Sequence, residues 1–520
     1  MDFITHAPSK SLILAAPDPL MIRDMIPRSK LLPDDRFTVA VKHTIDATRV
    51  LRNLGCDVPA PIISQYGWPG KYSPMVHQYT IADFCTMNRK LFNLSDPGVG
   101  KTASSLWAAD WLMATKRVRK CLIVAPLSTL ERVWLSDIFD VLMHRKAVVV
   151  HGSVEKRLSL LETDCDFYII NHDGLSIRQV REHLAKRADI DLIIVDEASM
   201  FRNASTRKYR DLKSLVREDQ RLWLLTGTPC PNEPTDAWAL AKLVQPTKVT
   251  RTFGQFRRLT MTQVSQFKWA PRPNAYTLAY EALQPAVRFR KGDCLDLPPV
   301  VTLNRQAALS AEQRDAVQTM KKYMQTVAGT TTITAVNAAD QINKMRQLLC
   351  GVVKDPFGTD GYLTLDYAPR RQVLMECVQE AAAKVLIIVP FKGIIRTLEE
   401  ELSKTYTVGV LNGDVSIRQR DLIIRNFKDT AEPHILLCHP KVMSHGLNLT
   451  EADMLIFYAP IYSNDEFQQV TERFNRAGQT RSMTIYRIGA HPLEWEIYRL
   501  VDGRKITQDA VLSLYNTMMS

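Results

Sequence analysis

The sequence predicts an α/β protein built from two lobes, each a parallel β-sheet flanked by helices, with a helical insertion and a small N-terminal α+β module. Three observations predict this class. In two regions of the chain, short apolar, β-branched runs alternate with helical stretches, which is typical of parallel strands buried on both faces. A segment of different composition separates these regions. The length of 520 residues is sufficient for about three domains of ~100–200 residues each.

The first 65 residues form the predicted N-terminal module. They contain seven prolines, which favour short elements over long ones. Arg36–Val41 is predicted to be a strand. Thr44–Leu54 is predicted to be a short helix that ends at Gly55, because glycine commonly follows the last turn of a helix.

Residues 66–245 form the predicted first lobe, and residues 298–520 form the second. Each lobe contains apolar runs that end near a polar loop, as expected for buried strands of a parallel sheet. In the first lobe these runs are Cys121–Ala125, Ala147–Val150, Phe167–Ile170, Leu192–Val195 and Leu222–Leu225. In the second lobe they are Val385–Val389, Thr407–Leu411, His434–Cys438, Met454–Phe457 and Met483–Arg487.

The segment between the lobes, residues 246–297, is predicted to be a basic and aromatic helical protrusion. From Pro246 to Lys291 it holds nine basic residues and one acid, with seven aromatic residues interleaved. This combination suits a groove along a nucleic-acid backbone, because cations neutralise phosphates and rings stack on bases. The alternative is a structural insertion with aromatic core residues and solvated arginines. The candidate DNA-binding residues here are Arg257, Arg258, Lys268 and Trp269.

The composition narrows the function classes. A net charge of +12 favours a polyanionic partner, usually nucleic acid, over a merely basic enzyme. Nine cysteines are scattered without a C-x-x-C pair or a Cys/His cluster, which predicts reduced thiols in a cytoplasmic protein. No apolar run reaches the ~18–20 residues of a membrane span, and the N-terminus lacks a signal-peptide pattern, so no membrane contact is expected.

The segment Ser95–Thr102 predicts a phosphate-binding loop that opens a helix. Its small residues allow a tight turn whose backbone N–H groups point at phosphates, and the candidates for these contacts are Asp96, Gly98 and Gly100. Lys101 is predicted to reach the β- and γ-phosphates, and Thr102 to ligate Mg²⁺. The strict pattern fails at its first position, where serine replaces glycine, so a chance Gly-Lys-Thr is the alternative.

Asp196 and Glu197 follow the apolar run Leu192–Val195 and supply a second half to this site. At the carboxyl end of a strand, Asp196 can hold the metal ion and Glu197 can polarise the attacking water. An Asp-Glu pair at a strand end is otherwise commonly a helix N-cap. About a hundred residues after a phosphate loop, the pair predicts ATP hydrolysis with ATP and Mg²⁺ as cofactors.

These motifs belong to an ordered series that resembles the superfamily 2 helicases, and within them the Swi/Snf-like DNA translocases. The resemblance implies two RecA-like lobes, a contact of Gln78 with the adenine, and DNA contacts by Pro126 and Thr226. The series begins with segments that match the family in chain order: Pro74–Gln78, Ile123–Leu130 followed by Trp134, Leu225–Pro229, Leu297–Pro299 at the entry to the second lobe, and Met345–Gln347.

The second lobe continues the series with Asn412–Asp414 and Arg420, Ser444–Leu449, and Gln469–Gln479. The resemblance implies that Arg473 and Arg476, which share one helix face, reach the γ-phosphate across the cleft between the lobes. It also implies nucleotide contacts by Gly446 and Gln469, and DNA contacts by Asn412 and Asn448. Two residues depart from the family pattern: Ser199 stands where histidine is frequent, and His445 where glycine is frequent.

The resemblance implies an ATP-dependent DNA translocase that remodels branched DNA by branch migration, fork regression, or Holliday junction or R-loop processing. A conventional strand-separating DNA or RNA helicase and an ATP-gated DNA clamp are the alternatives. The expected partner is duplex or branched DNA, bound by a monomer in the cytoplasm of a bacterial cell or phage-infected host. Thr48–Gly55 is similar to a segment of phage-type members, so the N-terminal module is expected to recognise a junction or to cap the first lobe.

Overall fold

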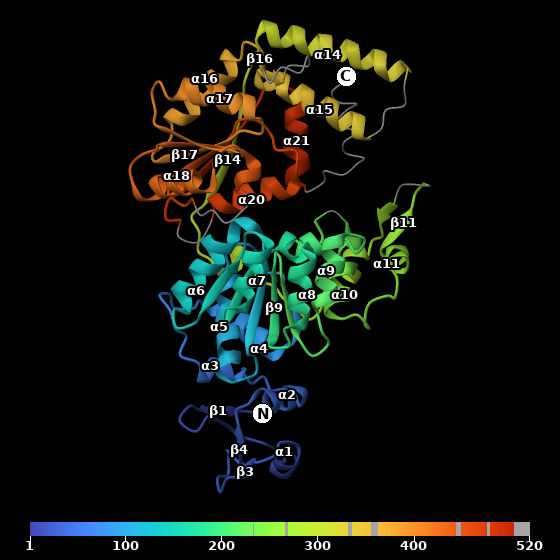
Figure 1. The fold of residues 1–520 in the computed structure, drawn as a ribbon, viewed down its shortest axis with the longest axis vertical. Helices are drawn as coiled ribbons and strands as arrows, with labels where there is room; N and C mark the ends of the chain where they lie inside the picture. The colour runs from blue at the N-terminus through green and yellow to red at the C-terminus, as the bar shows by residue number, and fades with distance from the viewer. Residues whose placement is uncertain are drawn as a thin grey trace. The chain divides into compact units, whose positions relative to one another are not determined.

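The computed structural model describes residues 1–231, 233–265, 269–330, 335–354, 362–443, 449–475 and 479–503. The chain divides into two compact units, Met1–Leu295 and Asp296–Ser520, and both are drawn in Figure 1. Each unit contains one large parallel sheet with helices on both faces, which confirms the predicted fold class. Within the described part of the chain, no helix combines the length and apolar character needed to cross a membrane.

The N-terminal module is a four-stranded antiparallel sheet, in the order β1-β2-β4-β3, with two helices. The predicted strand and helix are confirmed as β4 and α2, and the side chain of Thr44 caps α2 by accepting a hydrogen bond from the Ala47 N–H. Gly55 follows with a φ of +82°, which glycine adopts without strain. The elements are β1 (Phe3–His6), β2 (Ser11–Leu14), α1 (Pro19–Met25), β3 (Lys30–Leu31), β4 (Val39–Lys42) and α2 (Ile45–Asn53).

The large sheet of unit 1 has seven parallel strands in the order β13-β5-β10-β9-β6-β8-β7. The five strands predicted for the first lobe are confirmed, and β5 and β13 are additional. β13 belongs to the segment that we expected to form the protrusion, so this segment ends by returning to the sheet. The strands are β5 (Lys90–Asn93), β6 (Lys120–Ala125), β7 (Ala147–Val150), β8 (Phe167–Asn171), β9 (Ile190–Asp196), β10 (Arg221–Leu225) and β13 (Ala286–Val287).

Two apolar cores lie on opposite faces of this sheet, and successive residues of a strand alternate between them. In β9, Ile193 and Val195 belong to one core, and Leu192 and Ile194 belong to the other. Helices α7–α10 contribute to the first core and α4–α6 to the second, which explains why the strands are apolar throughout. The helices are α3 (Pro61–Gln65), α4 (Val76–Met87), α5 (Lys101–Ala114), α6 (Ser136–Val141), α7 (Val154–Glu162), α8 (Arg178–Lys186), α9 (Arg207–Leu215) and α10 (Ala237–Val244).

The protrusion contains two helices and a hairpin between them, followed by β13 and a short helix. Phe256 of its first helix is buried in the core that α7–α10 share, which fixes the protrusion to unit 1. The elements are α11 (Phe253–Thr260), β11 (Met261–Gln263), β12 (Trp269–Pro271), α12 (Ala275–Ala282) and α13 (Lys291–Cys294).

The sheet of unit 2 has six parallel strands in the order β14-β21-β20-β17-β19-β18. The five strands predicted for the second lobe are confirmed, and the edge strand β14 is additional. Its strands are β14 (Val300–Gln306), β17 (Lys384–Ile388), β18 (Val408–Leu411), β19 (Ile435–Cys438), β20 (Ala452–Phe457) and β21 (Met483–Gly489), and a hairpin adds β15 (Val352–Lys354) and β16 (Tyr362–Thr364). The helices are α14 (Ala311–Thr330), α15 (Ala335–Cys350), α16 (Ala368–Gln379), α17 (Lys392–Leu402), α18 (Ile417–Asp429), α19 (Pro440–Met443), α20 (Asn464–Phe474) and α21 (Pro492–Asp502).

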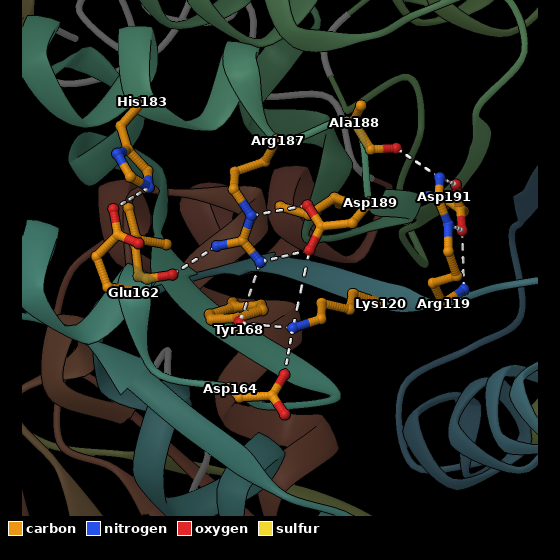
Figure 2. A network of polar contacts seen from close by, with 12 residues as sticks. Arg119, Lys120, Glu162, Asp164, Tyr168, His183, Arg187, Ala188, Asp189 and Asp191 are labelled. Carbon is orange, nitrogen blue, oxygen red and sulfur yellow. Dashed lines mark hydrogen bonds and ion pairs between the residues drawn. The ribbon is translucent and has the colours of Figure 1, made fainter.

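At the amino ends of β6, β8 and β9, charged side chains of unit 1 pair with one another (Figure 2). Arg187 donates to both carboxylate oxygens of Asp189, at 2.7 and 2.8 Å, and lies over the ring of Tyr168. Lys120 donates to Asp164 at 2.6 Å. The hydrogen bond from Arg187 lowers the pKa of Asp189 below its usual value. This network joins three strands to the end of α8, and its charged groups pair with one another.

Candidate nucleotide site

The opposite edge of the same sheet gathers the motifs predicted from the sequence. β10 lies between β5 and β9, and Leu225 is in register with Asn93 on one side and with Asp196 on the other. Because the strands are parallel, the segments that follow them leave the sheet at one edge, where α/β proteins place their ligands. The phosphate loop, the Asp-Glu pair and the segment that begins at Thr226 are therefore neighbours.

The phosphate loop connects β5 to α5. Gly98 and Gly100 have φ values of +85° and +80°, in the left-handed region that glycine adopts readily. Lys101 is the first residue of α5, and its Nζ donates to the carbonyl oxygen of Ser95 at 2.7 Å. Thr102 lies in the same first turn and is half-buried. The loop thus combines a helix N-terminus with an ammonium group, which is an arrangement suited to phosphate.

The start of α4 packs against this loop. The carboxamide oxygen of Gln78 accepts from the N–H of Met75 at 2.8 Å, and a Cβ on Gly100 would lie 1.9 Å from Gln78 Nε2. His77 Nε2 lies 2.8 Å from the carbonyl oxygen of Val99. The structure therefore places Gln78 beside the phosphate loop, and the φ of +80° favours glycine at position 100.

A third segment, which follows β13, runs along the other side of the loop. The N–H of Phe289 donates to the Ser95 hydroxyl at 3.1 Å, and the N–H of Asp96 donates to the Phe289 carbonyl at 2.9 Å. The N–H of Lys291 donates to the Asp96 carboxylate at 3.0 Å. Ser95 is the position where the strict motif has glycine, and this contact gives its buried hydroxyl a role that spacing alone could not reveal.

A cavity of about 1000 Å³ lies beside the loop, between α4 and the segment after β13. Its size is within the range of small-molecule sites. Two cations of the basic segment, Arg288 and Arg290, line this cavity, a position that neither interpretation of the segment from its sequence predicted. The lining residues are Pro74, Met75, Val76, His77, Thr80, Tyr280, Arg288, Phe289, Arg290, Asp293 and Cys294.

Asp196 ends β9 with both carboxylate oxygens engaged. Oδ2 accepts from the indole N–H of Trp134 at 3.0 Å, and Oδ1 accepts from the N–H of Glu197 at 3.0 Å. His172 Nε2 lies 2.9 Å from the carbonyl oxygen of Asp196, and burial lowers the pKa of His172. Glu197 has a φ of +49°, which is a strained conformation for a residue with a side chain and is frequent at functional sites.

The residues fit a nucleotide-borne Mg²⁺. This ion commonly takes one or two protein oxygens and completes its shell with phosphates and water. Asp196 offers a carboxylate, and Thr102 offers a hydroxyl at the phosphate loop. Among the described residues there is no cluster of three or more His, Cys, Asp or Glu side chains that would form a protein-only metal site. The donor set therefore suits a metal ion that arrives with phosphate oxygens.

The segment after β10 also contacts the phosphate loop. The N–H of Thr226 donates to the Asn93 carbonyl at 3.1 Å, and a Cβ on Gly227 would lie 2.8 Å from Pro97 Cδ. The side chains of Thr226 and Pro126, both predicted to contact DNA, are buried. The structure thus joins the matching segment Leu225–Pro229 to the phosphate loop.

The protrusion combines features of both interpretations of its sequence. Phe256 is a core residue, as the structural alternative expects, whereas Tyr276 is 60% exposed. The Arg257 guanidinium lies 4.2 Å from the ring centroid of Trp269. Arg258 lines a second cavity, of about 550 Å³, together with Thr250, Gln255, Leu259 and Arg272.

The remaining predicted residues belong to unit 2 or fall outside the described residues. The Asn412 side chain accepts from the Asp414 N–H at 2.9 Å, which stabilises a turn after β18. Gln469 and Arg473 lie on α20. Four predicted residues are outside the described residues: Lys268, Gly446, Asn448 and Arg476.

Two family profiles match the chain. The SNF2-related domain matches residues 88–356, and the helicase conserved C-terminal domain matches residues 369–478. The first match extends over more than half of the chain and includes the phosphate loop, the Asp-Glu pair and the segment after β10.

Similar proteins come from phages, bacteria and yeast. Protein p41 of Acyrthosiphon pisum secondary endosymbiont phage 1 is 24% identical over 85% of this chain and 98% of its own length. The uncharacterized ATP-dependent helicase MG018 of Mycoplasma genitalium is 24% identical over 75% of this chain. The ISWI chromatin-remodeling complex ATPase ISW1 of Saccharomyces cerevisiae is 23% identical over 75% of it. The chain spans only 37% and 36% of the latter two relatives.

Among solved structures, the Sulfolobus solfataricus SWI2/SNF2 ATPase core in complex with dsDNA is similar, at 20% identity and a TM-score of 0.42. The match covers 87% of this chain and 96% of that chain.

Proposed function

The chain belongs to the SNF2-related family of helicase-like ATPases, and from this premise we propose that it hydrolyses ATP to translocate along DNA and remodels branched DNA. The observation that carries the proposal is the meeting of three motifs at one sheet edge. Leu225 is in register with Asn93, which precedes the phosphate loop, and with Asp196, which precedes Glu197. This arrangement brings together the groups proposed to bind the phosphates, to bind the metal ion and to act as the general base.

Each residue of the site has a distinct chemical task in this proposal. Lys101 and the N–H groups of the loop bind the phosphates, and Glu197 takes a proton from the attacking water. Thr102 and Asp196 would hold Mg²⁺, which would supply positive charge against the charge that develops on the phosphates. In the same proposal, Arg473 and Arg476 complete the site as charges at the γ-phosphate, on the basis of the family resemblance.

The cavity beside the loop is where we assign the adenine and ribose. Gln78 abuts Gly100, and His77 links the cavity to the loop through Val99. The ring of Phe289 lies 5.7 Å from that of His77, so the cavity has an aromatic wall against which a base can pack. These contacts support a base-binding role for the start of α4.

DNA is the proposed track because of the net charge of +12 and the protrusion. The Arg257 guanidinium, stacked on Trp269, presents a cation and a ring together, which suits a phosphate backbone with adjacent bases. A strand-separating helicase and an ATP-gated clamp share this site and differ in what they do with DNA. The similarity to a phage protein over nearly its full length supports a phage-type or bacterial setting.

The N-terminal module is proposed to assist recognition of a junction, and it is firmly attached to α4. Arg52 donates to the Asp83 carboxylate at 2.9 and 3.0 Å, and Asp83 also accepts from the Ala60 N–H at 2.7 Å. Arg49 donates to the carbonyl of Met87 at 2.7 Å. These contacts equally suit a structural cap on lobe one, so removal of the module should be compared on junction and linear DNA.

Steady-state ATP hydrolysis with different nucleic acids tests the proposal. We expect the largest stimulation by a four-way junction or duplex DNA, compared with single-stranded DNA, RNA or no nucleic acid. Stimulation mainly by single strands or RNA would favour the conventional helicase. Turnover that no nucleic acid changes, combined with DNA binding that ATP alters, would favour the clamp.

DNA binding by the protrusion is tested by its salt dependence. Replacing Arg257 and Arg258 by alanine should weaken duplex binding and lower the slope of log K against log salt by up to ~0.9 per lost phosphate contact. Arg178→Ala is the control, because Arg178 is an exposed arginine outside the protrusion and pairs with Glu182 on α8. An unchanged slope in the double variant would return the protrusion to a structural role.

A further inference from the structure

Trp134 connects the metal-binding carboxylate to a segment far from it in sequence. It lies in a π-helical turn, Leu130–Leu135, between β6 and α6, and such turns are frequent at functional sites. Its side chain is fully buried in the core that α4–α6 share. Its only polar atom donates to Asp196 Oδ2 at 3.0 Å. A buried indole N–H usually finds a partner, and here the partner is the residue to which we assign the metal ion.

This hydrogen bond acts on the orientation of the carboxylate. Asp196 Oδ1 is held by the N–H of Glu197, and Oδ2 is held by the indole of Trp134. A carboxylate oxygen has two lone pairs, so each oxygen keeps one for a further ligand. Partners of this kind fix the direction of a metal ligand and are worth about 10–100-fold in metal affinity or activity.

The same indole lies just after Ile123–Leu130, a segment that matches the family series and contains Pro126, which is predicted to contact DNA. β6 and β9 are paired, with Val124 in register with Val195, so the residues after β6 pass next to Asp196. The segment from residue 126 to 135 is tightly built, because Thr129 donates through its N–H and its hydroxyl to the Pro126 carbonyl, at 3.0 and 2.9 Å. These two bonds hold residues 126–129 in a compact turn at the start of the segment that carries the indole.

We infer that Trp134 is a positioning residue: its indole N–H orients Asp196 toward Mg²⁺ and links that carboxylate to the segment of residues 126–135. This inference rests on the proposed function. Sequence reasoning named Trp134 only as a neighbour of a DNA motif. The contact with Asp196 spans 62 residues and comes from the fold.

Two variants with matched chemistry test the inference. Trp134→Phe removes the N–H but retains an aromatic ring. Trp107→Phe is the control, because Trp107 is also buried in the same core and its indole donates to the Pro69 carbonyl at 2.9 Å. Both variants lose one buried hydrogen bond, and only the first loses a contact with the metal site.

The measurement is calorimetric titration of the full chain with a non-hydrolysable ATP analogue, in Mg²⁺ and in EDTA. In Trp134→Phe we expect the Kd in Mg²⁺ to rise about tenfold while the Kd in EDTA stays the same. In Trp107→Phe both values should match the wild type. An unchanged ratio of the two Kd values in Trp134→Phe would overturn the inference.

A wild-type measurement keeps the inference testable if the variant is unstable. Hydrogen exchange should show greater protection of residues 126–135 with the analogue and Mg²⁺ than with the analogue and EDTA. Equal protection in the two conditions would overturn the link. Failure of the wild type to bind the analogue at all would instead count against the proposed function, so the two failures are distinguishable.

Discussion

In the seven-stranded sheet of unit 1, charged residues play different roles at the amino ends of the strands (the amino edge) and at their carboxyl ends (the carboxyl edge). At the amino edge, Arg187 forms a two-pronged contact with Asp189, and Lys120 pairs with Asp164 (Figure 2). At the carboxyl edge, Lys101 donates to the backbone carbonyl of Ser95. That edge also holds the three positive-φ residues of the site, Gly98, Gly100 and Glu197.

In this sheet, the residues that stabilise the fold and the residues arranged to bind a ligand lie at opposite ends of the strands. Charges that satisfy one another contribute to folding and offer little to a ligand. Backbone held in unusual conformations, with a cation and a carboxylate aimed at a common edge, costs stability and is preorganised for a ligand. Substitutions at the carboxyl edge should therefore change turnover, and substitutions at the amino edge should change stability.

The largest effect is expected for Lys101→Ala. Loss of the ammonium removes charge stabilisation at the phosphates, so kcat/KM for ATP should fall by about 10³-fold or more. Lys120→Ala, at the other end of the sheet, is the matched control and should retain normal kcat/KM at a permissive temperature. Steady-state hydrolysis measures both. Equal losses of activity in the two variants would remove the distinction between the edges.

The next effect concerns the two ends of a single strand, β9. Glu197→Gln should lower kcat by about 10²-fold or more, because the amide cannot accept a proton from water. Affinity for a non-hydrolysable ATP analogue should stay near that of the wild type. Asp189→Asn, just before the same strand, should leave kcat unchanged. Loss of analogue binding in Glu197→Gln would contradict the role assigned to Glu197.

The sequence predicted strands well where both faces are buried. The ten apolar runs all form strands because their residues alternate between two cores, as in β9. β14 was not predicted, because it is an edge strand whose residues are largely exposed. β13 consists of two residues and has no pattern to detect.

The site was predicted in its motifs but not in its connections. Local spacing identified Lys101, Asp196 and Glu197. The contact of Phe289 with Ser95 joins residues 194 apart in the chain, and only strand pairing brings them together. The structure places Gln78 beside the phosphate loop, and its adenine contact stays a prediction.

A smaller effect, on stability alone, is expected for Arg187→Ala. The variant leaves Asp189 without its two-pronged partner and removes a cation from the ring of Tyr168, so unfolding should cost about 2 kcal/mol less. Urea unfolding followed by tryptophan fluorescence measures this, because seven of the eight tryptophans are in unit 1. Arg178→Ala, which removes an exposed pair with Glu182, is the control and should cost at most ~0.5 kcal/mol. A lower kcat in Arg187→Ala under folded conditions would contradict the conclusion that the amino edge affects stability and not turnover.

The smallest expected effect is the pH dependence of the difference in unfolding free energy between the wild type and Arg187→Ala. The hydrogen bond from Arg187 lowers the pKa of Asp189, so the unfolded chain binds a proton more readily than the folded chain. The resulting stabilisation is present above the unfolded pKa of about 3.9 and is lost as the pH falls through the lowered folded value. The stability gap between wild type and Arg187→Ala should therefore narrow between pH 7 and pH 3.5, by about 1 kcal/mol or less. Parallel urea titrations at the two pH values measure the gap, and a gap that widens on acidification would show that Asp189 does not carry the contribution of Arg187.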